Sequence, residues 1–261
     1  DIHNGGDDGR TLPEGFGGQP GLFNTPSILT AAINHAQFWD GRVATLEEQV
    51  DGPLTSPTEM NSDWRRVLKY LTANPRYNEM FINFLGGEPN EERVRTALAT
   101  YQRALLTVDN PFDNWLRGDE SALSSDAYAG YYVFKKMNCV SCHSGEGVGG
   151  QLFQKLGSSK DYYGDHRPAD KQDLGRFNVT ENENDRFVFR VPSLRNVENT
   201  APYLHDGSIE TLEETVALMI EYQVGQEVNQ EDVRRLTLFL KSLSGKVPDM
   251  PKMPPKPTEE S

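Results

Sequence analysis

The segment CVSCH, residues 139–143, limits more than any other feature what this chain can fold into. Its two cysteines are the only ones among 261 residues, and a histidine directly follows the second. The spacing C-x-x-C-H is the attachment signature of c-type haem, in which the thiols hold the macrocycle and the histidine ligates the iron. The motif therefore predicts a covalent haem c at Cys139 and Cys142, with His143 as proximal ligand.

Two other interpretations of the motif are weaker. A thioredoxin-like dithiol needs a strand before the motif and a helix that opens at it. Here the preceding segment, SSDAYAGYYVFKKMN, has the pattern of a helix that ends at the motif. A structural zinc site needs two further ligands at close spacing, and the chain has no other cysteine. Because haem is attached covalently outside the cytoplasm in bacteria, the motif also predicts a periplasmic location.

Charge and hydropathy restrict the possible partners. The net charge of -13 argues against nucleic acid, whose binding relies on Lys and Arg against phosphates. The charge is compatible with steering of a basic partner, and equally with solubility alone. No apolar run approaches the ~20 residues of a membrane span, so none is expected. The chain begins with Asp1 rather than Met, which indicates that a signal peptide or a longer segment has been removed.

Helical patterns dominate the C-terminal half, and strand signals are few. The helix before the motif has Ser124 at its N-cap position, and Gly130 among its aromatic residues suits a close helix crossing. A final helix over residues 229–245 begins at Asn229 and presents one buried stripe, made of Val233, Leu236, Leu240 and Leu243. The best strand candidate is RFVFRVP. Residues 120–246 thus have the pattern of a cytochrome c domain.

The N-terminal part combines a long glycine-rich loop with three helical patterns. The patterns are NSDWRRVLKYLTAN, PRYNEMFINFLGG and NEERVRTALATYQRALLT. Asn90 is the expected cap of the last, and its expected buried face comprises Val94, Ala97, Leu98, Tyr101 and Leu105. Long loops inside compact domains are usually functional, but the pattern indicates no more than that.

The second axial ligand of the haem cannot be chosen from spacing alone. Met137 is too close to the motif to reach the opposite haem face, and Met250 and Met253 lie in a proline-rich tail. Met219, in SIETLEETVALMIEY, and His205, in PYLHDGS, remain as candidates. Methionine also commonly fills gaps in a core, so both candidates stay open at this point.

Three longer segments resemble bacterial di-haem cytochrome c peroxidases. NTPSILTAAINHAQFWDGRVATLEEQVDGPLTSPTEM is similar to their N-terminal haem domain. CVSCHSGEGVGGQLFQKLG and DRFVFRVPSLRNVENTAPYLHDGSIETLEETVALM are similar to their C-terminal haem domain. The resemblance implies a mainly α fold with two cytochrome c-like haem domains, long loops and little strand. The implied domains are residues 1–119 and 120–246, followed by a proline-rich tail at 247–261.

The resemblance also implies roles for individual residues of the two haem domains. His143 and Met219 match the axial ligands of the electron-transfer haem, which favours Met219 over His205. Trp39, in FWDGR, matches the tryptophan that lies between the two haems. The implied cofactors are one haem c in each domain and a calcium ion at their interface.

The remaining matches concern the peroxidatic haem and the calcium ion. Glu59, in PTEM, matches the acid–base carboxylate above the peroxidatic haem, and Gln49, in LEEQ, matches its companion in the pocket. Asn24 matches a calcium ligand, as do Thr200 and Pro202 through their backbone carbonyls. Oxygen ligands are those that a hard cation prefers.

The activity implied by the resemblance is reduction of hydrogen peroxide to water. Electrons would come from a small redox protein, a cytochrome c or a cupredoxin, and pass from the C-terminal haem to the N-terminal one; relatives are commonly homodimers. One alternative is a related di-haem enzyme that oxidises side chains of a partner protein, although the best-known example has tyrosine at the position of Met219. The other alternative is a single-haem electron carrier, which would need no acid–base group at Glu59.

Two departures from the family pattern stand out. Relatives carry a first C-x-x-C-H in the N-terminal domain, and this chain has none, so we expect the proximal ligand of the first haem to lie upstream of Asp1. His3 is a less favoured substitute, because it lacks the cysteine anchors. Phe16, in GFGGQPG, stands where many relatives carry a histidine that caps the peroxidatic iron. Phenylalanine cannot ligate iron, so the oxidised protein is expected to keep this site open.

Overall fold

The computed structural model describes residues 2–3 and 5–249, and in this part of the chain the fold is mainly helical, as predicted. The methionines at positions 250 and 253 and most of the proline-rich tail lie outside the described residues. The α-helices are α1 (Leu46–Gln49), α2 (Asp51–Thr55), α3 (Trp64–Ala73), α4 (Pro75–Leu85), α5 (Glu91–Arg103), α6 (Pro111–Leu116), α7 (Ser125–Lys136), α8 (Tyr162–His166), α9 (Phe177–Thr180), α10 (Leu212–Leu218) and α11 (Gln230–Lys241).

Strand content is small, and one irregular helix interrupts the pattern. Strand β1 (Phe153–Lys155) pairs antiparallel with β2 (Val188–Arg190), which lies inside the predicted strand RFVFRVP. A π-helix, η7 (Met219–Val224), continues α10. Short 3₁₀ turns join the other elements: Phe16–Gly18, Ala31–Ile33, Cys139–Ser141, Gln172–Leu174, Glu183–Asp185 and Val197–Asn199.

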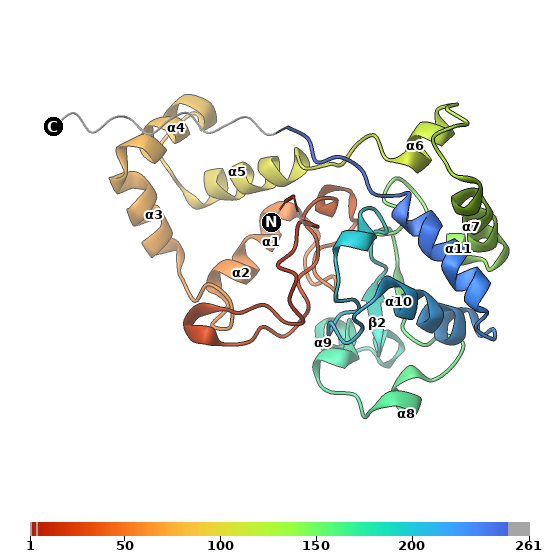
Figure 1. Ribbon diagram of the computed structural model, residues 1–261. Helices are drawn as coiled ribbons and strands as arrows, with labels where there is room; N and C mark the ends of the chain where they lie inside the picture. The colour runs from red at the N-terminus through yellow and green to blue at the C-terminus, as the bar shows by residue number, and fades with distance from the viewer. Residues whose placement is uncertain (1, 4, 250–261) are drawn as a thin grey trace.

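The helices separate into two groups. Figure 1 shows α3, α4 and α5 on one side of the molecule and α7, α10 and α11 on the other, with the loops before α1 between them. This arrangement is compatible with two domains, and the bounds expected from the sequence stay a prediction. Among the described residues, none of the helices combines the length and apolar character needed to cross a bilayer.

Helices α7 and α11 pack against each other over most of their lengths and organise the larger core. Ser124 and Asn229 cap them as predicted, each accepting hydrogen bonds from the first turn. Gly130 permits the close approach, because a Cβ there would collide with the carbonyl oxygen of Arg235 and lie 2.9 Å from Cβ of Phe239. The predicted stripe is confirmed, since all four of its members are buried: Val233, Leu236, Leu240 and Leu243.

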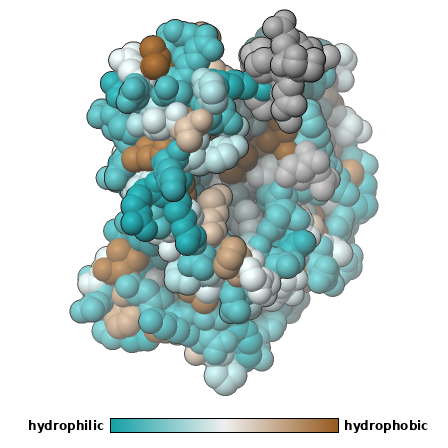
Figure 2. Space-filling model, turned by 90° about the vertical axis from the view of Figure 1, so that its left-hand side faces the viewer, coloured by the Kyte–Doolittle hydropathy of each residue, from teal (hydrophilic) through white to brown (hydrophobic). Residues whose placement is uncertain are grey.

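Helix α5 begins where its cap predicts, but it buries less of its apolar face than expected. Asn90 caps α5 through a bond from the backbone of Arg93. Val94 and Leu105 are buried, whereas Leu98 and Tyr101 are exposed, so that part of the predicted face is wrong. Helix α5 instead turns Ala99, which is fully buried, towards the packed side that it shares with α1. Figure 2, which faces the side of the molecule where α3 and α4 lie in Figure 1, shows a mostly hydrophilic surface with scattered apolar patches.

Candidate haem-binding site

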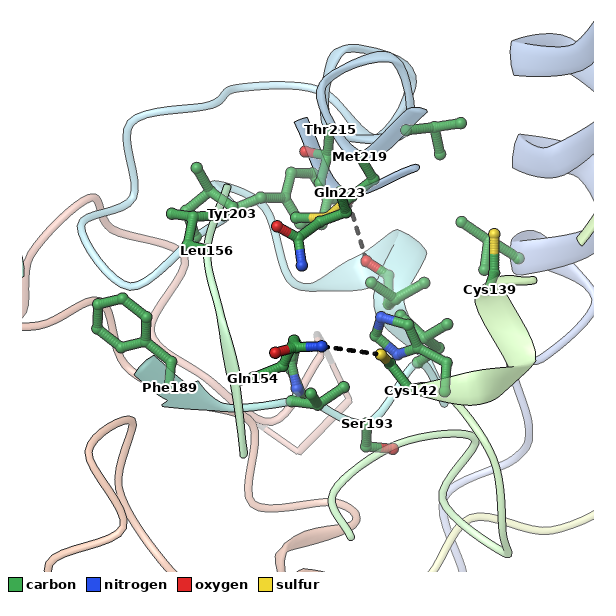
Figure 3. Close-up of a pocket in the computed structure, with 18 of the residues that line it drawn as sticks. Cys139, Cys142, Gln154, Leu156, Phe189, Ser193, Tyr203, Thr215, Met219 and Gln223 are labelled. Atoms are coloured by element: carbon green, nitrogen blue, oxygen red, sulfur yellow. Dashed lines mark hydrogen bonds between the residues drawn. The ribbon is translucent and has the colours of Figure 1, made fainter. Parts of the chain in front are cut away.

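A cavity of about 630 Å³ lies where the attachment motif, the β1–β2 region and the α10–η7 segment meet. Its lining includes Cys139, Cys142, His143 and Met219, which the sequence assigned to one haem site. The close-up in Figure 3 shows Met219 on one side of the cavity and Cys142 on another, with space between them. The volume falls in the usual range for cofactor sites.

The end of α7 and the turn that follows aim both thiols at this cavity. Asn138 adopts a left-handed conformation with φ 61°, which ends the helix and starts a 3₁₀ turn at Cys139. Both cysteines are free and half-buried, and burial raises the pKa of the Cys139 thiol to about 11. Gln154 Nε2 donates a hydrogen bond to Cys142 Sγ at 3.8 Å, drawn as a dashed line in Figure 3.

The imidazole of His143 is held in a form that can bind a metal ion. Its backbone N–H donates to the carbonyl of Cys139 at 2.9 Å, which fixes it directly behind the turn. Burial lowers the pKa of His143 to about 4, with the nearby backbone of Val148 and Pro192 acting in the opposite direction. The ring is therefore neutral at pH 7, and its buried Nδ1 makes no hydrogen bond of normal geometry with the described residues. A neutral imidazole is the ligating form.

The two candidates for the second axial ligand have different surroundings. Met219 and His205 both line the cavity. His205 is committed elsewhere, because its Nε2 lies 2.7 Å from Oδ1 of the fully buried Asp173 and its ring stacks on Phe189 at a centroid distance of 4.3 Å. Met219 is the first residue of the π-helix and is only half-buried. This geometry supports Met219, whose ligand role stays a prediction.

These residues fit haem c. Two free thiols, a neutral imidazole with a buried unpaired nitrogen and a thioether line one cavity, whose other walls are largely apolar. Cys139 and Cys142 would hold the macrocycle covalently, and His143 and Met219 would ligate the iron. Bound there, a haem would supply one-electron chemistry at a potential that a thioether ligand raises.

Trp39 connects the N-terminal segment to this cavity. It lines the cavity, and its Nε1 donates to the backbone carbonyl of Asn24 at 2.9 Å. The backbone N–H of Asn24 in turn donates to the carbonyl of His205 at 2.8 Å. The rings of Trp39 and His205 meet edge to face at 6.4 Å. The indole is therefore held in one orientation at the boundary between the two groups of helices.

The three predicted calcium ligands line the same cavity: Asn24, Thr200 and Pro202. The side chain of the buried Asn24 is oriented by its Nδ2, which donates to the carbonyls of Arg10 and Thr11 at 2.9 and 3.3 Å. Both bonds use the amide nitrogen, so its Oδ1 is directed away from these carbonyls. An amide oxygen and backbone carbonyls are oxygen ligands of the kind that calcium prefers.

Glu59 and Gln49 lie outside this cavity, in the N-terminal half. Glu59 follows α2 and is half-buried; burial raises the pKa of its carboxyl group, and the charge of Arg42 opposes the shift. The guanidinium of Arg42 stacks on the ring of Phe38, 3.4 Å from its centroid. Phe38 directly precedes Trp39 in the sequence. Gln49 is the last residue of α1. The backbone N–H of Phe16 donates to the backbone carbonyl of Glu59 at 2.6 Å. The structure thus brings Phe16 beside Glu59.

The sequence did not indicate two residues that line the cavity or one residue that holds another lining residue in place. Gln154 contacts a cysteine sulfur, Asp173 holds His205, and Arg190 lines the cavity while almost fully buried. Only Arg190 had a usable signal, since it is a charged residue between apolar residues of the predicted strand RFVFRVP. Gln154 and Asp173 lie in segments with no pattern that marks them.

Comparison with known proteins identifies the family. Residues 1–121 match the family model described as di-haem cytochrome c peroxidase. The cytochrome c551 peroxidase of Nitrosomonas europaea is 42% identical over 254 residues, which cover 96% of this chain and 75% of that protein. The cytochrome c peroxidase Ccp of Escherichia coli K12 is 43% identical over 246 residues, or 94% of this chain, and the chain spans about half (52%) of that relative.

A solved structure gives the same result for the fold. The crystal structure of a MauG-like protein associated with microbial copper homeostasis superposes with a TM-score of 0.78 at 26% sequence identity, covering 92% of this chain and 80% of that one. The chain therefore belongs to the di-haem cytochrome c peroxidase family, a family of haem oxidoreductases. The resemblance predicted from its sequence motifs and its mainly helical fold are both confirmed.

Proposed function

We propose that the protein containing this chain reduces hydrogen peroxide to water in the periplasm, with electrons from a small redox protein, a cytochrome c or a cupredoxin. Electrons would pass from the haem site at Cys139 and Cys142, past Trp39, to a second haem beside Glu59. A homodimeric state, common among relatives, stays a prediction.

One observation carries this proposal. The chain combines a haem-attachment cavity with a separate, half-buried carboxylate, Glu59, whose pKa burial raises. An electron carrier needs only the first feature, whereas peroxide reduction consumes two protons with two electrons and needs a group that moves them. Burial brings the pKa of Glu59 closer to neutral pH, where acid–base catalysis is efficient.

Different residues of the chain are proposed to handle protons and to orient the aromatic ring between the sites. Glu59 would take a proton from the bound peroxide and return it to the departing oxygen, and Gln49 is proposed as its companion in the pocket by the resemblance to the family. Arg42 lies near enough to influence Glu59 and stacks on Phe38, which fixes the backbone leading to Trp39. Trp39 fills the space at the cavity wall with an aromatic ring whose N–H is satisfied by Asn24.

Steady-state turnover tests the proposal. The mature holoprotein, characterised by intact mass and haem content, is given a reduced cytochrome c or cupredoxin and hydrogen peroxide. Donor oxidation that requires peroxide, with two haems per chain, is the expected result. One haem per chain without peroxide turnover would make the protein an electron carrier. Two haems with oxidation of a partner protein's side chains, but no turnover with a donor, would favour the second alternative.

Phe16 leads to a prediction about the oxidised protein. Phe16 is 64% exposed, and its backbone N–H donates to the backbone carbonyl of Glu59, so it lies next to the residue proposed to handle peroxide. A phenyl ring offers no ligand for iron, so the second haem is expected to be five-coordinate or water-bound before any reduction. Electron paramagnetic resonance of the oxidised holoprotein should therefore contain a high-spin component. Two six-coordinate low-spin haems would contradict this prediction.

Calcium is proposed to bind at Asn24, Thr200 and Pro202. Replacing Asn24 with alanine should lower calcium affinity by at least ~10–100-fold, because only one of the three ligands is a side chain and its loss leaves two carbonyls. Competition with a fluorescent chelator measures the affinity. Thr25→Ala is a suitable control, since Thr25 lines the same cavity but its hydroxyl binds Asp8. Equal affinities for the Asn24→Ala variant and the unaltered protein would remove Asn24 from the site.

A further inference from the structure

Arg190 is a buried cation without a counter-ion among the described residues. Its relative exposure is 4%, and its Nη1 is buried without a hydrogen-bond partner. Within residues 2–3 and 5–249, its guanidinium makes one hydrogen bond, from Nε to the backbone carbonyl of Phe38 at 3.3 Å. Burial lowers the pKa of Arg190 to about 10, so the side chain is still charged at pH 7.

An isolated buried charge is costly. Arginine cannot relieve the cost by losing its proton near neutral pH, so a buried guanidinium is normally paired with an anion. No ion pair of Arg190 with Asp or Glu occurs in the described part of the chain. Since Arg190 lines the cavity, the partner that it lacks is expected inside the cavity.

The charges on the cavity wall also favour an anion inside the cavity. The cavity lining contains no Asp or Glu, although the chain has a net charge of -13. Four cationic side chains line it: Lys136, Lys155, Arg190 and Arg195. The two lysines are exposed. Arg195 already has an anionic partner, with its Nη1 2.8 Å from Asp113. Arg190 is thus the lining cation that is both buried and unpaired.

Hydrogen bonds place Arg190 beside the segment that carries Trp39. Arg190 is the last residue of β2, next to Phe189, which Figure 3 shows across the cavity from Cys139 and Cys142. Its backbone N–H also donates to the carbonyl of Trp39 at 2.8 Å. The unpaired cation therefore lies where β2 meets the segment that carries Trp39.

We infer that Arg190 binds a carboxylate of the tetrapyrrole held at Cys139 and Cys142. The macrocycle then lies with its vinyl edge at the cysteines and its carboxylate edge at β2. The same arginine bonds the carbonyl of Phe38 and, through its backbone, that of Trp39. It therefore ties the carboxylate edge to the segment that carries the bridging tryptophan. This inference rests on the proposed haem site but not on peroxide chemistry.

Infrared spectroscopy of the holoprotein tests it directly. Growth on 5-aminolaevulinate carrying ¹³C at its carboxyl carbon labels the propionate carboxyl groups of every haem in the protein. In the unaltered protein, one of the labelled groups should stay ionised well below the pKa of an exposed carboxyl group, about 4. The reason is that a buried guanidinium beside a carboxylate favours its charged form. Protonation of all the labelled groups in the ordinary range would overturn the inference, without any variant being needed.

Variants assign the effect to Arg190. In Arg190→Met, the labelled group loses its buried counter-ion, and a protonated carboxyl band should appear at pH 7; Arg190→Lys should keep the ionised band. Lys136→Met removes the same charge from the exposed rim of the cavity and should leave both bands unchanged. Identical bands in Arg190→Met and the unaltered protein would give Arg190 a packing role only. None of these readouts uses peroxide, so a failure of the proposed activity would be seen separately.

Discussion

Replacing Glu59 with glutamine should lower kcat/KM for hydrogen peroxide by about 10²–10⁴-fold, the usual contribution of a positioned acid–base group. Glutamine keeps the size and polarity of the side chain but cannot exchange a proton. The variant should retain haem content and the spectrum of the attached haem, because Glu59 lies outside the cavity that holds Cys139 and Cys142. Stopped-flow oxidation of the reduced donor measures the change.

The pH profile of the unaltered protein gives the second part of this expectation. The carboxylate must be ionised to accept the first proton, so kcat/KM should rise with pH through the pKa of Glu59. Burial raises that pKa, so the acidic limb of the profile, the pH range in which kcat/KM rises, should lie above the pKa of an exposed glutamate, about 4.3. The limb should vanish in Glu59→Gln and persist in Glu14→Gln, a matched change at an exposed carboxylate that pairs with Arg10. Full activity of Glu59→Gln would exclude the assigned role.

The parts of the fold that local sequence signals determine were predictable. The caps at Ser124, Asn90 and Asn229 and the apolar stripe of α11 all depend on residues within a few positions of one another. The attachment motif was equally clear, because its chemistry requires a fixed spacing. For the same reason the haem site could be located from five consecutive residues.

Features that depend on distant contacts were not predictable. Leu98 and Tyr101 share a helical face with Val94, but only the packing of α5 on α1 decides which stripe is buried. The π-helix that starts at Met219 has no signal in local periodicity, although such distortions often occur at functional sites.

His205 shows the same limit within the candidate site. Sequence spacing left it equal to Met219 as an axial ligand until the resemblance favoured Met219. The partner that occupies its Nε2 is Asp173, 32 residues away. Arg167 holds that carboxylate in turn, with Nη1 2.6 Å from its oxygen. A buried network of this kind depends on the folded chain, so spacing could not have reduced the candidates to one.

Replacing Met219 with histidine should lower the reduction potential of the attached haem by on the order of 0.1 V or more, within the ~0.8 V range that axial ligands cover. A thioether favours the reduced iron, whereas a second imidazole favours the oxidised form. Met219→Leu should instead remove the sixth ligand. Met137→Leu is the matched control, because Met137 lines the same cavity and is buried, but it precedes the motif by two residues.

Spectroelectrochemical titration of the three variants measures these potentials. Met137→Leu should stay close to the unaltered protein, and an unchanged potential in both Met219 variants would assign the sixth ligand elsewhere. In turnover, Met219→His should slow electron supply from the donor while leaving the pH limb of Glu59 in place. Glu59→Gln should do the opposite: the rise of kcat/KM with pH should disappear, while the reduction potential of the attached haem stays unchanged. Such opposite patterns are expected only if the chain separates electron storage, at the Met219 cavity, from proton transfer, at Glu59.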